Sequence, residues 1–210
     1  NPEAGKETTM KLKKAEKPKK ILVVGGGPGG LSAALDAKRA GHEVEIWEKT
    51  YTLGGMINAA GRPSFKLEVD HLAQWYRRQI VKYQIPVQYN KEATAENILA
   101  AGADAVIVAT GAQSRKFPIK GIDKENVVTA IDAMMDWATL GENLVVVGGG
   151  LVGCEASLHL ASRGKKITII EMANKLLPEP IFYMNEIMLT QMVMSNPNVQ
   201  TMVGTKLVEI

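Results

Sequence analysis

The sequence has a single cysteine and no long hydrophobic run, and each shortage excludes a class of protein. Cys154 is the only cysteine among the 210 residues. One cysteine rules out an internal disulfide, a CxxC redox pair and a cysteine-ligated metal cluster built by this chain alone, and it fits a reducing, cytoplasmic setting. No apolar run approaches the roughly 20 residues of a membrane-spanning helix. We therefore expect a soluble protein with no membrane partner.

Basic residues are concentrated at the start of the chain. The net charge is +3, but seven lysines precede Ile21. The remainder is close to neutral, so nucleic acid is not an expected partner. Residues 1–20 also hold few large apolar side chains and are predicted to form a linker. They contain neither a signal peptide nor a transit pattern, and we expect this start to be cut from a longer chain.

Clustered metal ligands are also lacking. His42, His71 and His159 stand alone, with no metal-ligand spacing among them, so we predict no metal site and either solvated or core histidines. Cys154 lies near the start of a predicted helix, where the pKa of a thiol can fall. Neither a second cysteine nor a basic neighbour accompanies it, so we expect Cys154 to serve packing rather than redox chemistry.

A repeated glycine-rich unit is the main feature that the sequence does contain. A buried strand over 21–24 runs into three glycines, and a helix over about 29–40 and a strand over 43–47 follow. The same order returns 123 residues later (148 minus 25), with strands over 144–147 and 166–170. Such spaced self-similarity indicates duplicated domains.

The predicted fold class is therefore α/β, with two Rossmann-like dinucleotide-binding domains built on parallel sheets. We place a first domain over 21–140, which includes a strand over 105–109, and a second, incomplete domain over 141–210.

Two other segments carry apolar stripes at helical spacing, and both are predicted to face a core. The first lies within 70–83, with Arg77, Arg78 and Lys82 facing away; its apolar members are Leu72, Trp75, Tyr76, Ile80 and Tyr83. The second follows Pro180 and consists of Met184, Met188 and Met192. A missing segment that normally covers this second helix would leave the methionines exposed, which would favour association such as a homo-oligomer.

The first glycine run matches the dinucleotide fingerprint GxGxxG. Gly25 permits the tight turn, Gly27 leaves room for a pyrophosphate, and Gly30 lets the helix pack closely on the strand. The phosphates would face the helix N-terminus. Glu48 lies 18 residues beyond Gly30, at the end of the next strand, where it would accept hydrogen bonds from ribose hydroxyls.

The second glycine run repeats every part of the first. Gly148, Gly150 and Gly153 form the fingerprint, and Glu171 again follows the third glycine by 18 residues. A carboxylate there repels a 2′-phosphate, so NADH is favoured over NADPH. Lys175, four residues further on, is the feature that complicates this choice.

With these fingerprints, the Leu53-Gly54-Gly55 loop and the Ala109-Thr110-Gly111 segment, the chain resembles the two-dinucleotide-binding flavoproteins. Within that superfamily it is similar to the C-terminal part of the NADH:flavin oxidoreductases, which include 2,4-dienoyl-CoA reductase, enoate reductases and trimethylamine dehydrogenase. The resemblance implies FAD in the first site and NAD(P)H in the second. It implies that the chain passes a hydride from NADH to FAD.

The resemblance also implies parts outside this chain. These are an N-terminal TIM barrel with FMN, which would be its partner domain, and the cysteines of a [4Fe–4S] cluster, whose last ligand would sit just before Asn1-Pro2-Glu3-Ala4-Gly5. Residues 208–210 are expected to lie in a strand, with the rest of the second domain and the returning part of a discontinuous FAD domain beyond them. In the parent enzyme, electrons would pass through the cluster to FMN and reduce an activated C=C bond.

We nominate no catalytic acid or base, because the cofactors carry the chemistry and the protein supplies position and electrostatics. The predicted FAD contacts are Gly25, Gly27, Pro28, Gly29, Gly30, Glu48, Lys49, Gly55, Met56, Ala93, Thr110 and Gly111. The predicted NADH contacts are Gly148, Gly150, Leu151, Val152, Gly153, Glu171 and Met172. Glu155 either helps to hold the NADH pyrophosphate end or only stabilises the helix dipole.

Two alternatives stay open from the sequence. The first site could hold ADP in a structural role, as the resemblance to trimethylamine dehydrogenase allows. The chain could also be an inactive fragment that binds adenine nucleotides without turnover.

Overall fold

The computed structural model describes residues 4–115 and 117–210, and these form two compact units. Unit 1 comprises the chain up to Asn58 together with Glu68–Ala112, and unit 2 comprises Ala59–Leu67 and Gln113–Ile210. The sequence places its domain boundary after residue 140, whereas the compact units separate after residue 112. Each unit is described by itself.

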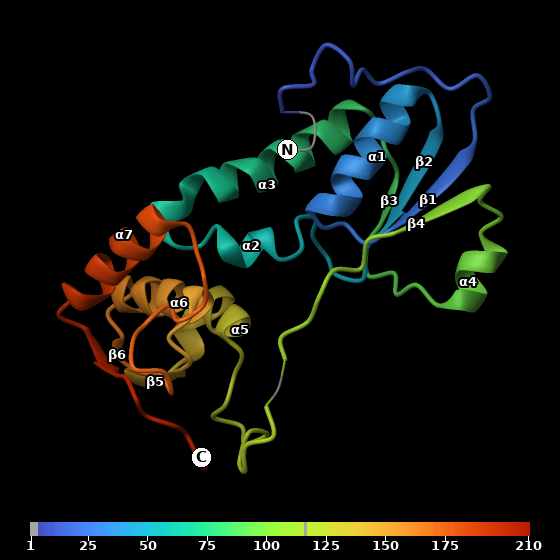
Figure 1. Ribbon diagram of the computed structural model, residues 1–210. Coiled ribbons are helices and arrows are strands. Elements are labelled where there is room, and N and C mark those ends of the chain that lie inside the picture. Colours follow the sequence, from blue (N-terminus) through green and yellow to red (C-terminus); the bar gives the residue numbers. More distant parts are fainter. Residues whose placement is uncertain (1–3, 116) are drawn as a thin grey trace. The chain divides into compact units, whose positions relative to one another are not determined.

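Unit 1 is built on a four-stranded parallel sheet in the order β3-β2-β1-β4 (Figure 1). Its strands are β1 (Lys20–Val24), β2 (Glu43–Trp47), β3 (Val87–Gln88) and β4 (Ala105–Val108). Strands β1, β2 and β4 match the predicted ones to within a residue because each apolar run is ended by glycine or a polar residue, whereas the sequence analysis does not predict the two-residue strand β3. In this order β1 is central, which brings the ends of β2 and β4 to either side of the glycine turn that follows Val24.

Helices cover both faces of this sheet (Figure 1). Alternate side chains of a strand point to opposite faces, so Val23 and Ile46 pack with the α1 side while Leu22, Val24 and Trp47 pack with the α4 side. The helices are α1 (Pro28–Ala40), α3 (Leu67–Lys82) and α4 (Ala95–Ala100). Gly41 closes α1 in the left-handed conformation, at φ 102°.

The buried stripe of α3 differs from the predicted one. Ala73 and Ile80 are its buried residues, and Tyr76 packs against the same core. Leu72 and Trp75 remain exposed, at 42% and 38%. Positions 73, 76 and 80 form one stripe at helical spacing, and residues 72 and 75 fall to one side of it. The prediction that Leu72 and Trp75 are core residues is therefore wrong.

Unit 2 carries a three-stranded parallel sheet in the order β5-β6-β7. Its core lies between this sheet and two long helices, with Leu160, Ile169 and Val193 among the fully buried side chains. Its strands are β5 (Asn143–Val147), β6 (Lys166–Ile170) and β7 (Val199–Met202), and its helices are α5 (Ala130–Met135), α6 (Leu151–Ser162) and α7 (Tyr183–Met194), with a 3-10 turn over Trp137–Thr139.

Two expectations for the end of the chain are not met. Met184 and Met188 on α7 are 49% and 57% exposed, and only Met192 packs against the core. The helix buries Leu189 and Val193 instead, because α7 is apolar on all sides and its composition does not select one face. Residues 208–210 form no strand; Glu209 makes a single bridge to Lys120.

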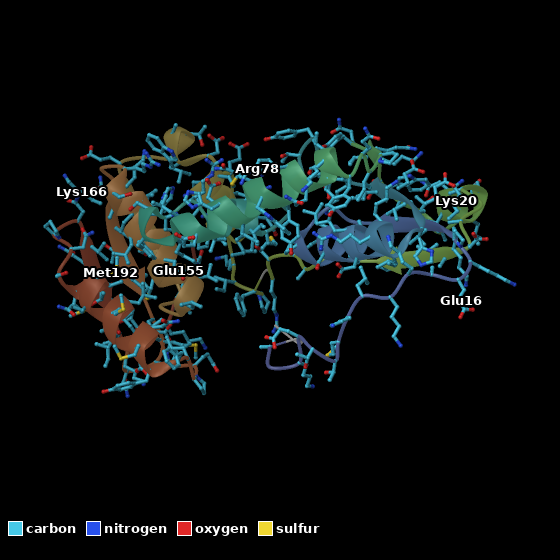
Figure 2. The ribbon with its side chains drawn as sticks, turned by 90° about the horizontal axis from the view of Figure 1, so that it is seen from above. Glu16, Lys20, Arg78, Glu155, Lys166 and Met192 are labelled. Atoms are coloured by element: carbon cyan, nitrogen blue, oxygen red, sulfur yellow. The ribbon has the colours of Figure 1, made fainter. Side chains whose placement is uncertain are left out.

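The short segment 59–67 belongs to unit 2 although unit 1 precedes and follows it in sequence. Helix α2 (Ile57–Ala60) runs into this segment, and a 3-10 turn covers Ser64–Lys66. Ala59 packs with Met134 of α5 and Ala156 of α6. Lys66 donates to both carboxylate oxygens of Glu155, at 2.9 and 2.8 Å, and Figure 2 shows Glu155 on α6.

The predicted linker has no regular structure before β1 in its described part, and residues 1–3 lie outside the described residues. It makes polar contacts with the rest of unit 1; the amide of Lys19, for example, donates to Nδ1 of His42 at 3.1 Å. Among the residues that the structure describes, no helix combines the length and apolar character needed to cross a membrane.

Candidate functional site: two glycine turns with buried carboxylates

The glycine turn after β1 is sterically closed to other residues at two positions. Gly25 has φ 109°, and a Cβ there would lie 2.3 Å from the carbonyl oxygen of Ala109. A Cβ at Gly30 would lie 1.9 Å from the carbonyl oxygen of Gly25. Both distances are far inside van der Waals contact, so the first and third fingerprint glycines have the packing roles predicted from the sequence.

The start of α1 is left open for a ligand. Gly27 is the N-cap in extended conformation, Pro28 follows it, and no side chain caps the helix or places an acid in its first turn. A Cβ at Gly27 or Gly29 would have no protein atom within 4 Å. Uncapped amides and the positive end of the helix dipole therefore face free space, which suits a pyrophosphate.

Glu48 is buried at the end of β2 and is fixed by the turn itself. Its exposure is 6%. One carboxylate oxygen accepts from the amide of Gly26 at 2.7 Å, and the other accepts from the amide and hydroxyl of Thr50, both at 2.8 Å. These donors hold the carboxylate beside the glycine turn, and the oxygen that accepts from Gly26 keeps a lone pair for a ribose hydroxyl.

The loop after β2 closes over the same turn. Leu53 is buried, and a Cβ on Gly26 would lie 2.5 Å from its side chain. The amide of Gly54 donates to the carbonyl of Gly26 at 2.8 Å. Gly55 has φ 52°, and a Cβ there would lie 3.0 Å from the Cα of Gly27. The backbone of Gly54 and Gly55 thus borders the space in front of α1.

The turn after β5 repeats this construction in unit 2. Gly148 has φ 105°, and a Cβ on Gly153 would lie 1.9 Å from its carbonyl oxygen. Gly150 is the uncapped N-cap of α6, with free space where a Cβ would be. A Cβ on Gly148 would also meet free space. In unit 1 strand β4 lies beside β1 at this position, whereas no described strand occupies the corresponding side of β5.

Glu171 repeats the position of Glu48. It is 6% exposed at the end of β6, and its carboxylate accepts from the amides of Gly149 and Ala173, both at 2.7 Å. Leu176 packs over Gly149, and the amide of Leu177 donates to the carbonyl of Gly149 at 2.8 Å. Leu177 is buried at φ 51° where unit 1 has Gly54.

Sequence reasoning missed the middle glycines. The amides of Gly26 and Gly149 donate to the two carboxylates, and their carbonyls accept from the loops that follow. The GxGxxG fingerprint nevertheless allows any residue type at both positions. The contacts of Gly26 with residues 48, 53 and 54 recur from Gly149 to residues 171, 176 and 177, each 123 further on. Alignment of the two glycine-rich units at their offset of 123 residues would have identified these residues.

The remaining predicted contacts are distributed around the turns. Near the first turn, Lys49, Met56, Thr110 and Gly111 are exposed, while Ala93 is partly buried against Leu22, Val24 and Trp47. Near the second turn, Leu151, Val152 and Met172 are exposed at 42%, 51% and 72%. All of these follow a strand end or begin a helix, except Met56 and Ala93, which lie in loops.

Two residues of α6 have structural partners. The Glu155 carboxylate, 15% exposed, is bound by Lys66. Cys154 is fully buried, and its thiol lies 3.3 Å from the carbonyl oxygen of Gly149. Burial, followed by the charges of Glu171 and Glu155, raises the pKa of Cys154 to about 11. This environment supports the packing role predicted for Cys154 and removes the reactive thiolate.

Chemically, each turn offers a pyrophosphate cradle next to a fixed carboxylate, which is the donor set for the adenosine diphosphate half of a dinucleotide. The observed space at Gly27 and Gly150 fits that group. The ammonium group of Lys175 forms an exposed ion pair with Glu186 at 3.1 Å. No cluster of three potential metal ligands occurs within residues 4–115 and 117–210.

Comparison with known proteins agrees with this geometry. The family model described as pyridine nucleotide-disulphide oxidoreductase matches residues 19–210. Cinnamate reductase of Clostridium sporogenes is 41% identical over 93% of the chain, and NADH oxidase of Thermoanaerobacter brockii is 40% identical over 82%. The structure of a 2-naphthoyl-CoA reductase complex covers the whole chain with a TM-score of 0.92 and 29% identity.

The chain spans about a third of the length of these relatives, covering 30% and 27% of the two curated proteins and 32% of the solved one. The resemblance to the enoate reductase group that the motifs indicate is thereby confirmed, as is the Rossmann-like α/β fold. The chain belongs to the pyridine nucleotide-disulphide oxidoreductase family.

Proposed function

We propose that unit 1 binds FAD, that unit 2 binds NADH, and that the chain passes reducing equivalents from NADH to FAD. The observation that carries the proposal is the pair of congruent cradles, each with an open helix start and a buried carboxylate at 6% exposure. When bound, the cofactors supply the redox chemistry as hydride transfer from nicotinamide to flavin. The chain's own residues bind and orient them.

The different loops support this assignment of the two cofactors. In unit 1 the loop that borders the space before α1 consists of Gly54 and Gly55, whose backbone can approach a ligand closely. The corresponding residues of unit 2 are Leu177 and Pro178. A ligand that passes over the loop therefore has better access in unit 1. The family's dithiol chemistry is not proposed for this chain, because Cys154 is its only cysteine.

We propose NADH rather than NADPH as the reductant. Both oxygens of Glu171 are anchored, so this carboxylate stays beside the ribose position and would repel a 2′-phosphate. The nearby Lys175 is paired with Glu186, whose negative charge counters that of the lysine.

For the whole protein we propose reduction of an activated C=C bond, with electrons relayed from this chain through a [4Fe–4S] cluster to FMN in other domains. The reduction of a C=C bond is supported by two relatives, a cinnamate reductase and a 2-naphthoyl-CoA reductase.

An absorbance spectrum followed by anaerobic addition of NADH tests the proposal. We expect the visible bands of oxidised flavin in the FAD-loaded chain, and we expect NADH to bleach them. Half-maximal bleaching of the Glu171→Gln variant should require about tenfold more NADH, because a neutral amide is a weaker acceptor for the ribose hydroxyls. Glu142→Gln, an exposed glutamate whose partner is Lys166, is the matched control and should behave as wild type.

Two other outcomes would contradict the proposal in different ways. A chain that binds ADP and NADH but never FAD would favour a structural nucleotide-binding role for unit 1. A chain that responds to none of these nucleotides would overturn the interpretation of both cradles.

A further inference from the structure

Arg77 is the one α3 arginine that reaches the glycine loop of unit 1. Its guanidinium group donates to the carbonyl of Leu53 from Nε at 3.1 Å and from Nη2 at 2.9 Å, and Nη2 also donates to Oδ1 of Asn58 at 2.5 Å. Its neighbour Arg78 is exposed and makes no hydrogen bond or ion pair within the described part of the chain; Figure 2 shows it on α3. The sequence predicts that both arginines face away, and for Arg77 this is wrong.

Asn58 completes the contact. Its Nδ2 donates to the same Leu53 carbonyl at 3.2 Å, so three N–H donors converge on one oxygen. Its Oδ1 also occupies the space beside Gly54, where a Cβ would lie only 2.2 Å from it. Arg77 and Asn58 together therefore fix both ends of the loop 53–58. We name this pair the loop clamp.

The clamped loop leads directly to the candidate site. The amide of Gly54 is bonded to Gly26, and Gly55 lies against Gly27, the residue that opens α1. Gly54 and Gly55 have φ of 120° and 52°, and two such glycines in a row lose much conformational freedom when they are ordered. Charge-assisted hydrogen bonds from a partly buried arginine can offset that cost before a ligand arrives.

No such clamp occurs in the described part of unit 2. The loop there carries Leu177 and Pro178 in place of the two glycines. Leucine and proline restrict the backbone by themselves. Among the described residues, the clamp therefore lies beside the loop that has two consecutive glycines.

We propose that Arg77, with Asn58, is a positioning residue for the dinucleotide of unit 1, which it serves by holding the Gly54–Gly55 backbone beside the pyrophosphate cradle. The inference rests on the proposed function of that cradle. It assigns to Arg77 no contact with the reacting atoms.

Fluorescence titration of the full 210-residue chain with FAD tests the clamp in Arg77→Gln, Asn58→Ala and the control Arg78→Gln. Loss of charge-assisted hydrogen bonds should weaken FAD binding about 10- to 100-fold in the first two variants and leave Arg78→Gln unchanged. Because both residues act on one loop, their effects should not add. The double variant should bind FAD about as tightly as whichever single variant binds it less tightly.

Two further readouts separate positioning from general stability. The affinity for NADH and the thermal midpoint of the unliganded chain should match those of Arg78→Gln. A variant Arg77→Lys should recover only part of the FAD affinity, because an ammonium group cannot reproduce the fork of donors. Equal losses at both cradles, together with a lowered midpoint, would overturn the positioning role.

The clamp and the proposed function fail separately. If wild type binds FAD and Arg77→Gln binds it equally well, the clamp is overturned and the function of unit 1 stands. If wild type binds no FAD, the function assigned to unit 1 falls and the clamp with it. Should Arg77→Gln fail to fold, Asn58→Ala, which keeps the arginine, decides the matter by the same titration.

Discussion

At the scale of single residues, His159 is the polar side chain whose burial has a consequence for stability. It is 2% exposed on α6, and neither ring nitrogen has a hydrogen-bond partner in the described structure. Burial, followed by the positive charge of Arg163, lowers the pKa of His159; a backbone group of Met134 opposes this shift and Arg62 adds to it. The folded chain therefore resists protonation of this ring.

A pH dependence of unit 2 follows from that shift. Because the folded pKa of His159 lies below its unfolded value of about 6.5, stability is complete above that pH and is lost as the pH falls below it, by at most about 1.4 kcal/mol per pH unit. Hydrogen exchange of peptides from α6, corrected for intrinsic rates, should report this loss as the pH falls below about 6.5. His159→Leu should flatten the profile, whereas His71→Leu, at an exposed histidine, should not. Equal slopes in wild type and His159→Leu would contradict the assignment.

Cys154 should be chemically silent while the chain is folded. With no exposed surface and a pKa of about 11, only about one thiol in a thousand is ionised at pH 8. An aromatic disulfide reagent should therefore label the native chain far more slowly than the urea-unfolded chain, which should take up one equivalent. Rapid native labelling without loss of helical circular dichroism would show that the thiol is accessible after all.

At the scale of elements, the segment 59–67 is joined to unit 2 by the Lys66–Glu155 pair. Side-chain exposures of 25% and 15% make this pair much less hydrated than the Lys166–Glu142 pair, whose exposures are 64% and 68%. Figure 2 shows Glu155 and Lys166 on unit 2. Lys66→Met leaves a half-buried carboxylate without its partner, so we expect a loss of about 1–2 kcal/mol, between the values for exposed and buried pairs.

Chemical denaturation of Lys66→Met and of the matched variant Lys166→Met measures that difference. Lys166→Met should change the free energy of unfolding by less than about 0.5 kcal/mol. Similar effects for the two variants would mean that segment 59–67 contributes nothing through its lysine to the stability of unit 2.

Elements differ in how far the sequence predicts them. Strands β1 and β5 are found within a residue because a continuous apolar run ending in glycine has few alternatives. The inner face of α7 could not be predicted, because that helix is apolar on all sides. The place of segment 59–67 depends on a contact between residues 89 apart in sequence, and no local pattern encodes such a contact.

In the candidate site, too, local features can be predicted from the sequence and contacts between distant residues cannot. The fingerprint glycines and the acids Glu48 and Glu171 follow from local steric rules that any strand, turn and helix of this kind must obey. Arg77 could not be assigned, because its partner Leu53 is 24 residues away and is bound through its carbonyl, which is common to every residue type. Side-chain chemistry alone is therefore a poor guide to donors that bind the backbone.

At the scale of the whole molecule, the internal repeat predicts two adenine nucleotide sites in one chain. The turns of unit 1 and unit 2 use the same set of contacts, and their carboxylates share no partner. Calorimetric titration of the chain with ADP, which carries the half of the dinucleotide common to both cofactors, should therefore give two sites per chain. Glu48→Gln should weaken one site and Glu171→Gln the other, each by about tenfold, since ribose hydroxyls lose a charged acceptor.

Because the two carboxylates belong to different compact units, their effects should add in the double variant. Excess NADH before the titration should remove the site that depends on Glu171 and leave the site that depends on Glu48, which distinguishes the two cradles without mutation. A stoichiometry of one in wild type, unchanged by Glu171→Gln, would mean that the second turn is a structural copy that binds no nucleotide. The identity of the two sets of backbone contacts argues against that outcome, because both turns place an uncapped helix start beside a buried carboxylate.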